Sequence, residues 1–189
     1  YDFDSVLVEK SDISRSDIPI YIHGSANGDV LPYPGEGDKA IIIRDNRIHA
    51  ITQVPGAHTD LITVFEGPRG ILVERNRIDA SDAVGGANVG SSVQVQTSSA
   101  TAGNFVFRNN HVISDDSDHS QNFGPATSCY CPSPVDWSDN RVDLNSTTLF
   151  AYGRPGCSDC PTLGSDGSHT CTGNVFEDGS PQTCSGNGL

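Results

Sequence analysis

Residues 41–48 read Ile-Ile-Ile-Arg-Asp-Asn-Arg-Ile, and related stretches return at residues 71–78 (Ile-Leu-Val-Glu-Arg-Asn-Arg-Ile), 105–112 (Phe-Val-Phe-Arg-Asn-Asn-His-Val) and 135–142 (Val-Asp-Trp-Ser-Asp-Asn-Arg-Val). A leading copy lies at residues 6–13, and a degenerate one at residues 169–176. All six copies share a polar residue at spacings of 35, 30, 34, 30 and 34 residues: Ser11, Asn46, Asn76, Asn110, Asn140 and Asn174. Self-similarity at such an interval predicts a repeat architecture.

Apolar side chains lie mainly five and three residues before the shared polar residue and two after it, as Ile41, Ile43 and Ile48 do around Asn46. A period of two predicts a strand with one buried face. The Asn falls near a bend, where its amide can replace a missing backbone partner. Further apolar stretches lie between the copies, and we interpret them as the other strand of each turn: residues 18–22, 61–65, 92–96, 121–123 and 149–152.

A unit of about thirty residues cannot bury its apolar face alone, whereas stacked units can. Parallel strands stacked about 4.8 Å apart would align the shared asparagines into a ladder of hydrogen-bonded amides. We therefore predict an all-β chain that forms a single-stranded right-handed parallel β-helix of about six coils. The alternative is a β-sandwich, which needs hairpins. The candidate turns, at Asn27-Gly28 and Asp178-Gly179, do not lie between paired strands.

All six cysteines lie in the last third of the chain: Cys129, Cys131, Cys157, Cys160, Cys171 and Cys184. An even number among Gly, Ser and Pro is typical of disulfides formed in an oxidising compartment, which predicts a secreted or cell-surface protein. A zinc site is the alternative, because a Cys-x-Cys pair and a Cys-x-x-Cys pair together offer four thiolates. We expect residues 1–128 to form coils and residues 129–189 to form the last coils, with Cys-stapled loops and a C-terminal cap, in the same domain.

The Asn-x-(Ile/Val) turns that follow an alternating apolar strand, with Gly173-Asn174-Val175-Phe176 as a variant, resemble those of the right-handed β-helix (pectin-lyase-like) superfamily. The resemblance covers about residues 3–178. It implies a fold but no single function, because that group includes polysaccharide lyases, glycosidases, sugar epimerases, phage tailspikes and secreted adhesins. No catalytic motif of the family maps onto this chain residue by residue.

The chain is acidic, with 11 Lys and Arg against 24 Asp and Glu and a net charge of -13. Its overall field would repel nucleic acid and anionic membranes. No run approaches eighteen apolar residues, so we expect no membrane insertion. Motifs of zinc proteases, serine hydrolases and nucleotide-binding loops are missing from the sequence. Asn145 begins the only Asn-x-Ser/Thr glycosylation acceptor.

Stacking also brings basic side chains together. One residue after the shared polar residue come Arg47, Arg77, His111 and Arg141, and Arg108 lies two residues before its Asn. One interpretation is an ion network with Asp45, Asp79, Asp139 and Asp143. The other is a binding surface, in which guanidinium groups pair with carboxylates or sulfates of an acidic glycan.

Carboxylates supply a second candidate site. If the loops stack, one face would hold Asp79, Asp82, Asp115 and Asp116. Carboxylate oxygens in such a cluster can ligate Ca²⁺, which is the candidate cofactor. Two of the carboxyl groups could instead serve as the general acid and base of a glycosidase. An ordinary polar loop is the simpler interpretation, because the spacing is not that of an EF-hand.

The sequence thus predicts an extracellular structural or adhesive β-helix module that presents loops, with carbohydrate as its candidate ligand. The alternative function is a polysaccharide lyase or glycosidase, or a fragment of one, acting on an acidic glycan. Self-association is a further expectation, because a solenoid with complementary ends can stack end to end.

Overall fold

The computed structural model of this chain describes residues 5–23, 35–52, 59–65, 69–79, 81, 89–96, 103–113, 122–123, 135–142, 151–152 and 169–182. Every regular element within these ranges is a strand. In the described part of the chain, no helix has the length and apolar character needed to cross a membrane. The expected division between residues 128 and 129 falls outside these ranges and stays a prediction.

The strands form three sheets. Sheet A contains β1 (Val6–Glu9), β4 (Ile41–Arg44), β7 (Arg69–Glu74), β10 (Gly103–Arg108), β13 (Val135–Ser138) and β16 (His169–Thr172). Sheet B contains β2 (Asp12–Ser14), β5 (Arg47–His49), β8 (Arg77–Asp79), β11 (His111–Ile113), β14 (Arg141–Val142) and β17 (Val175–Phe176). Sheet C contains β3 (Ile20–His23), β6 (Thr59–Phe65), β9 (Val89–Gln96), β12 (Asn122–Phe123) and β15 (Ala151–Tyr152).

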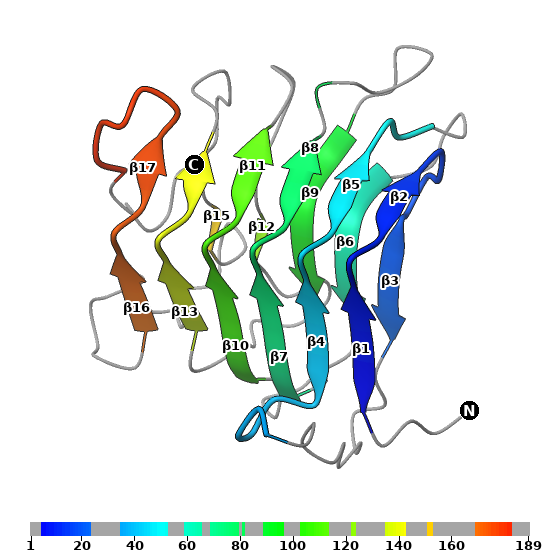
Figure 1. The fold of residues 1–189 in the computed structure, drawn as a ribbon, viewed down its shortest axis with the longest axis horizontal. Helices are drawn as coiled ribbons and strands as arrows, with labels where there is room; N and C mark the ends of the chain where they lie inside the picture. Colours follow the sequence, from blue (N-terminus) through cyan, green and yellow to red (C-terminus); the bar gives the residue numbers. More distant parts are fainter. Residues whose placement is uncertain are drawn as a thin grey trace.

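Neighbouring strands within every sheet are parallel and keep the register of the repeat. Ile41 pairs with Ile71, and Ile71 pairs with Phe105. This arrangement confirms a parallel stack of about six coils and rules out the β-sandwich. Figure 1 shows sheets A and B on the near side and sheet C behind them, with the coils following one another from right to left.

A bend with left-handed backbone geometry separates sheet A from sheet B in each coil. The residue before the shared polar residue has a positive φ in all six copies: Lys10 (51°), Asp45 (56°), Arg75 (54°), Asn109 (54°), Asp139 (54°) and Gly173 (69°). The eight-residue motif therefore contains two short strands on two sheets. In the first five coils, the third strand lies in the apolar stretches between the motifs, as predicted.

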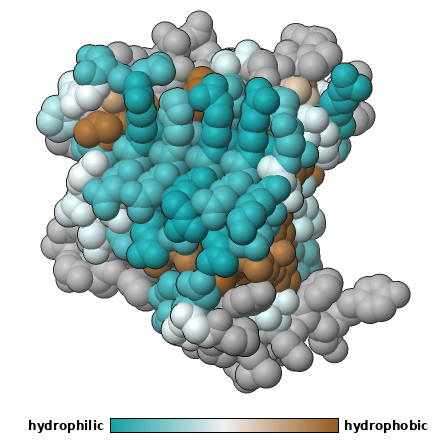
Figure 2. Space-filling model, viewed as in Figure 1, coloured by the Kyte–Doolittle hydropathy of each residue, from teal (hydrophilic) through white to brown (hydrophobic). Residues whose placement is uncertain are grey.

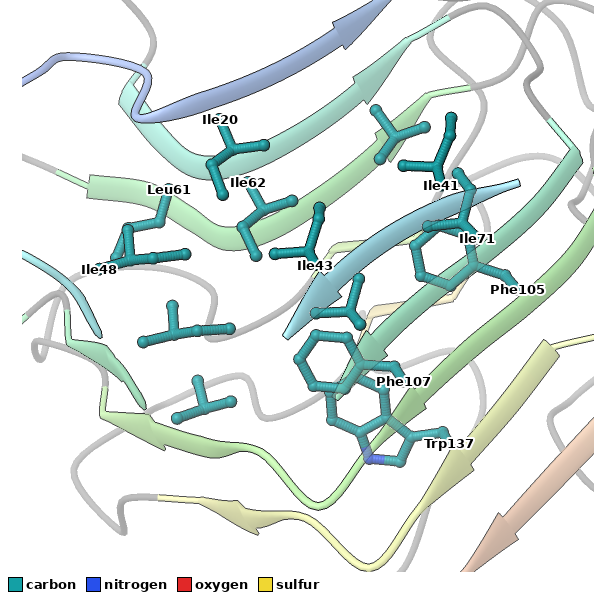
Figure 3. Close-up of a cluster of buried hydrophobic side chains, with 14 of the residues drawn as sticks. Ile20, Ile41, Ile43, Ile48, Leu61, Ile62, Ile71, Phe105, Phe107 and Trp137 are labelled. Atoms are coloured by element: carbon teal, nitrogen blue, oxygen red, sulfur yellow. The ribbon is translucent and has the colours of Figure 1, made fainter. Parts of the chain in front are cut away.

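The interior is apolar and receives side chains from all three sheets, as Figure 3 shows. Phe107 and Trp137 stack there with ring centroids 4.1 Å apart and planes 7° apart. These rings belong to the core, because both residues are fully buried. Burial of an Ile or Phe contributes about 1.5–3 kcal/mol each. The buried cluster contains Ile20, Ile41, Ile43, Ile48, Ile51, Leu61, Ile62, Val64, Ile71, Val73, Ile78, Phe105, Phe107, Val112, Val135 and Trp137.

The shared asparagines form the predicted ladder. Asn46 donates from its backbone N and from Nδ2 to Oδ1 of Asn76, both at 3.0 Å. Equivalent pairs join Asn76 to Asn110, Asn110 to Asn140 and Asn140 to Asn174. The backbone N of Ser11 donates to Oδ1 of Asn46 at 3.0 Å and begins the ladder. Polar groups buried beside the apolar core are thereby satisfied.

Candidate functional site

Four of the five predicted binding residues lie in one row on sheet B. Arg47 pairs with Arg77, Arg77 with His111, and His111 with Arg141, so equivalent positions of four successive coils are aligned. We call these four residues the arginine row. Arg108 belongs to β10 on sheet A, on the other side of the bend. The structure therefore divides the predicted basic group into two surfaces.

On sheet A, the arginines contact carboxylates closely. Arg108 places Nε 3.0 Å and Nη2 2.9 Å from Oε2 of Glu74, whose side chain is 5 % exposed. Arg75 lies 2.5 Å from the other oxygen of Glu74 and donates to both oxygens of Asp45 at 2.8 and 2.9 Å. The hydrogen bond from Arg75 lowers the pKa of Asp45, and the same bond raises the pKa of Arg75.

The ion pairing continues toward the N-terminal end of sheet A. Arg44 donates to Glu9 at 2.9 Å and to Glu36 at 2.6 Å, and these two hydrogen bonds raise the pKa of Arg44. Two residues before the shared polar residue, successive coils alternate in charge: Glu9, Arg44, Glu74 and Arg108. We call these four residues the ion ladder. Figure 2 shows the hydrophilic surface that covers the middle of this face.

The ion network predicted from sequence therefore exists, mainly on sheet A. Asp45 takes part in it, as expected, and Asp79 pairs with Arg77 on sheet B. The glutamates of the ion ladder were missed as partners. The signal in the sequence that identifies them is their alternation with arginine two residues before the shared polar residue. Asp143 lies outside the described residues.

The arginine row is more exposed and less tightly paired at its two ends. About half of the side-chain surface of Arg47 (52 %) and of Arg141 (51 %) is exposed. Within the described residues, their nearest carboxylate contacts are long, at 3.8 Å from Arg47 to Asp12 and 3.8 Å from Arg141 to Glu177. Arg141 also donates to the backbone oxygen of Glu177 at 2.8 Å. Guanidinium donors that remain in contact with solvent can pair with an anionic ligand.

His111 lies between two arginines of the row. Its Nδ1 is 3.4 Å from Nη1 of Arg77, and its Nε2 is buried without a hydrogen-bond partner within the described part of the chain. Burial lowers the pKa of His111 below 6.5, and the charges of Arg77 and Arg141 lower it further, against the opposing effect of Glu177 and Asp79. Burial and the two arginine charges therefore favour the neutral imidazole.

Asp79 is already engaged in local contacts. Its side chain is 7 % exposed, and Oδ2 accepts a hydrogen bond from Arg77 at 2.8 Å. Oδ1 accepts from the backbone N of Ser81 at 3.2 Å and from its hydroxyl at 2.6 Å. Both oxygens therefore hold the end of β8 in place. These three hydrogen bonds occupy most of the acceptor sites of the carboxylate.

The rest of the predicted carboxylate site, Asp82, Asp115 and Asp116, lies outside the described residues, so a shared face stays a prediction. Within the described ranges, no group of three or more His, Cys, Asp or Glu residues is arranged to hold a metal ion. A calcium site in the loops is therefore untested.

Cys171, on β16, is disulfide-bonded. The structure does not describe the other predicted disulfide residues, so their pairing stays a prediction: Cys129, Cys131, Cys157, Cys160 and Cys184. Asn145, the predicted glycosylation acceptor, also lies outside the described ranges.

Comparisons of the chain with protein-family models, with curated proteins and with solved structures find no match. The description of the stacked coils and of the two charged surfaces therefore comes from the structure of this chain and not from a related protein. Membership of the pectin-lyase-like superfamily stays a prediction.

Proposed function

We propose that this protein is an extracellular β-helix module with a structural or adhesive role that binds acidic glycans along the arginine row. We also propose that the helix is right-handed, belongs to the pectin-lyase-like superfamily, and ends in a Cys-rich cap. The path in Figure 1 supports this handedness: the chain rises along sheets A and B, returns along sheet C, and advances from right to left. The disulfide at Cys171 supports an extracellular location.

The observation that carries the proposal is the alignment of Arg47, Arg77, His111 and Arg141 on four successive coils. Strands of one sheet are about 4.8 Å apart, so the row is a regular ladder of donors parallel to the solenoid axis. An extended chain that carries a carboxylate or sulfate on successive sugars matches such a ladder. Each guanidinium can form two charge-assisted hydrogen bonds to one anionic group.

The contrast between the two charged surfaces explains why sheet B is the better candidate. On sheet A, Glu74 and Asp45 occupy the donors of Arg75 and Arg108 at hydrogen-bonding distance. On sheet B, the contacts of Arg47 and Arg141 to carboxylates of the described residues are 3.8 Å long, and those carboxylates are themselves exposed. An acidic glycan competes weakly with the first set of contacts and strongly with the second.

A non-catalytic role is supported by the state of Asp79, whose two oxygens bind Arg77 and Ser81. The alternative function is a polysaccharide lyase or glycosidase that uses Asp82, Asp115 and Asp116 in the loops. Product analysis during the binding experiment distinguishes the two functions, because only an enzyme releases shorter chains with new reducing ends.

The test is binding of heparin and polygalacturonate, with dextran as a neutral control, at near-physiological ionic strength. The variant is Arg47→Gln with Arg141→Gln. The matched control is Lys10→Gln with Arg15→Gln, which removes the same charge from residues outside the row. Charge-assisted hydrogen bonds contribute about 1.5–3 kcal/mol each, so we expect the row variant to lose at least about tenfold in affinity. Equal losses in both variants, or no binding of either acidic glycan, would contradict the proposal.

A further inference from the structure

The C-terminal edge of sheet B is occupied by a segment of its own coil. In the preceding coils, the backbone oxygen of each shared polar residue accepts a hydrogen bond from the next coil, as Ser11 does from the backbone N of Arg47 at 2.9 Å. The oxygen of Asn174 instead accepts from the backbone N of Gln182 at 2.9 Å. Gln182 therefore occupies the place of a seventh coil.

The chain reaches Gln182 through a turn that follows β17. Phe176 donates from its backbone N to the oxygen of Ser180 at 2.8 Å, and Gly179 donates to the oxygen of Phe176 at 2.9 Å. Oδ1 of Asp178 accepts from the backbone N of Ser180 at 2.9 Å and from its hydroxyl at 2.6 Å. Gly179 has a φ of +83°, a conformation that favours glycine. The turn is thus fixed by its own hydrogen bonds.

The returning segment has the wrong direction and chemistry to extend the stack. Pro181 forms an antiparallel bridge to Val175, whereas all strand pairs of the three described sheets are parallel. Proline has no N–H to donate to another strand. The side chain of Gln182 is buried, with only 6 % of the residue exposed. Covering an edge with a loop and placing proline on it are both ways in which proteins protect a sheet edge from further pairing.

The N-terminal edge of the stack has the complementary donor. Asp12 on β2 pairs with Arg47, so it occupies the same place in its coil. Since the N–H of Arg47 bonds to Ser11 in the preceding coil, the N–H of Asp12 is the donor that would reach a preceding coil. A second copy stacked end to end would direct that donor to the oxygen of Asn174.

We propose that residues 177–182 form an end cap that excludes a second copy of this chain from the C-terminal edge of sheet B. The strand of that copy that would otherwise pair with β17 is β2. The cap prevents this pairing because the N–H of Gln182 already donates to the backbone oxygen of Asn174. This proposal does not rest on glycan binding, although Glu177 at the start of the cap contacts Arg141 of the arginine row.

The first test opens the turn with Gly179→Val, because a β-branched residue disfavours the left-handed backbone. Gly35→Val is the matched control, since Gly35 has a φ of +82° and, like Gly179, no atom near the position of an added Cβ. Light scattering over a range of concentrations measures the mass. We expect assemblies that grow with concentration for the Gly179 variant, and monomers for the wild type and the Gly35 variant. Oligomers of the wild type, or monomers of a folded Gly179 variant, would overturn the proposal.

A second pair of variants tests the hydrogen bond itself. Gln182→Pro removes the N–H that bonds to Asn174, and we expect the same concentration-dependent assembly. Adding Asp12→Pro to this variant removes the donor of the incoming copy and should restore the monomer. Assembly that persists in the double variant would show that the contact is not between β2 and β17, and the proposal would be wrong.

Discussion

Lys39, two residues before β4, donates from Nζ to the backbone oxygen of Asn104 on β10 at 3.3 Å and contacts its side-chain oxygen. The two residues meet although β7 lies between β4 and β10 in sheet A. The intervening coil contributes Gly70, whose backbone oxygen accepts from Ala40 at 2.7 Å. A Cβ on Gly70 would lie 2.2 Å from the backbone oxygen of Asp38. Three coils therefore meet at a place where only glycine fits.

This geometry predicts that Gly70→Ala destabilises the protein. The variant combines a φ of +72° with a clash against backbone, and we expect a loss of about 3 kcal/mol in the free energy of unfolding. Gly37→Ala is the control, because Gly37 has a φ of +65° and no atom within 4 Å of an added Cβ. Its backbone strain alone should cost about 1 kcal/mol. Denaturant unfolding measures both values, and equal losses would contradict the clash.

The amide ladder predicts that truncating a side chain at its centre lowers the free energy of unfolding much more than truncating one at its end. Asn110→Ala removes the acceptor for the backbone N and Nδ2 of Asn76, and the donor to the backbone oxygen of Val73. Buried groups would lose their partners, so we expect a loss of about 3–5 kcal/mol in the free energy of unfolding.

Ser11→Ala is the matched variant at the end of the ladder. Ser11 joins the ladder through its backbone N, and among the described residues its hydroxyl bonds to the backbone oxygen of Glu9 alone. We expect this change to cost less than about 1 kcal/mol. Comparable losses at Ser11 and Asn110 would show that the ladder side chains contribute little to stability.

The ion pair of Arg75 and Asp45 predicts a pH dependence of stability. The pKa of Asp45 is lowered from 3.8 by its hydrogen bonds to Arg75. A carboxylate whose pKa is lower in the folded state stabilises the fold above its unfolded pKa, and that contribution disappears as the pH falls through the folded value. Asp45→Asn should therefore be less stable than the wild type at pH 7, and the difference should begin to shrink near pH 3.8 and vanish only below the lower pKa of the folded state. Melting temperatures across this range check the effect, and a constant difference would contradict it.

Much of the fold was predictable because the repeat is strict where the core is built. Ile43, Asn46 and Ile48 have equivalents in successive coils, so spacing alone indicated parallel stacking and the ladder. The number of sheets was less predictable. Residues 47–49 form a strand of only three residues directly after the bend. Such a strand is too short to show its own alternation, so it was interpreted as the end of the preceding one.

The candidate site was predictable only where the repeat determines register. The row that contains Arg77 and His111 follows from their position after the Asn. Asp82 and Asp115 lie in segments of variable length between coils, where equal spacing no longer indicates spatial proximity. Pairing of Glu74 with Arg108 also follows from the repeat, because both lie two residues before a shared Asn.

The position of His111 predicts that glycan binding tightens in acid, a prediction that rests on the proposed function. Burial, Arg77 and Arg141 keep the pKa of the free imidazole below 6.5. An anion bound along the row would raise that pKa, because it favours the imidazolium. Binding then takes up a proton, and affinity rises as the pH falls through the interval between the two values, by up to tenfold for each unit of difference.

Heparin is the suitable probe, because its sulfates stay ionised while His111 titrates. Affinity measured between pH 5 and pH 7.5 should rise on acidification for the wild type and change less for His111→Asn. His23→Gln, which alters an exposed histidine on sheet C, should keep the full dependence. Equal dependence in all three proteins would assign the effect to other groups and remove His111 from the binding row. Absence of binding at every pH would instead contradict the glycan proposal itself.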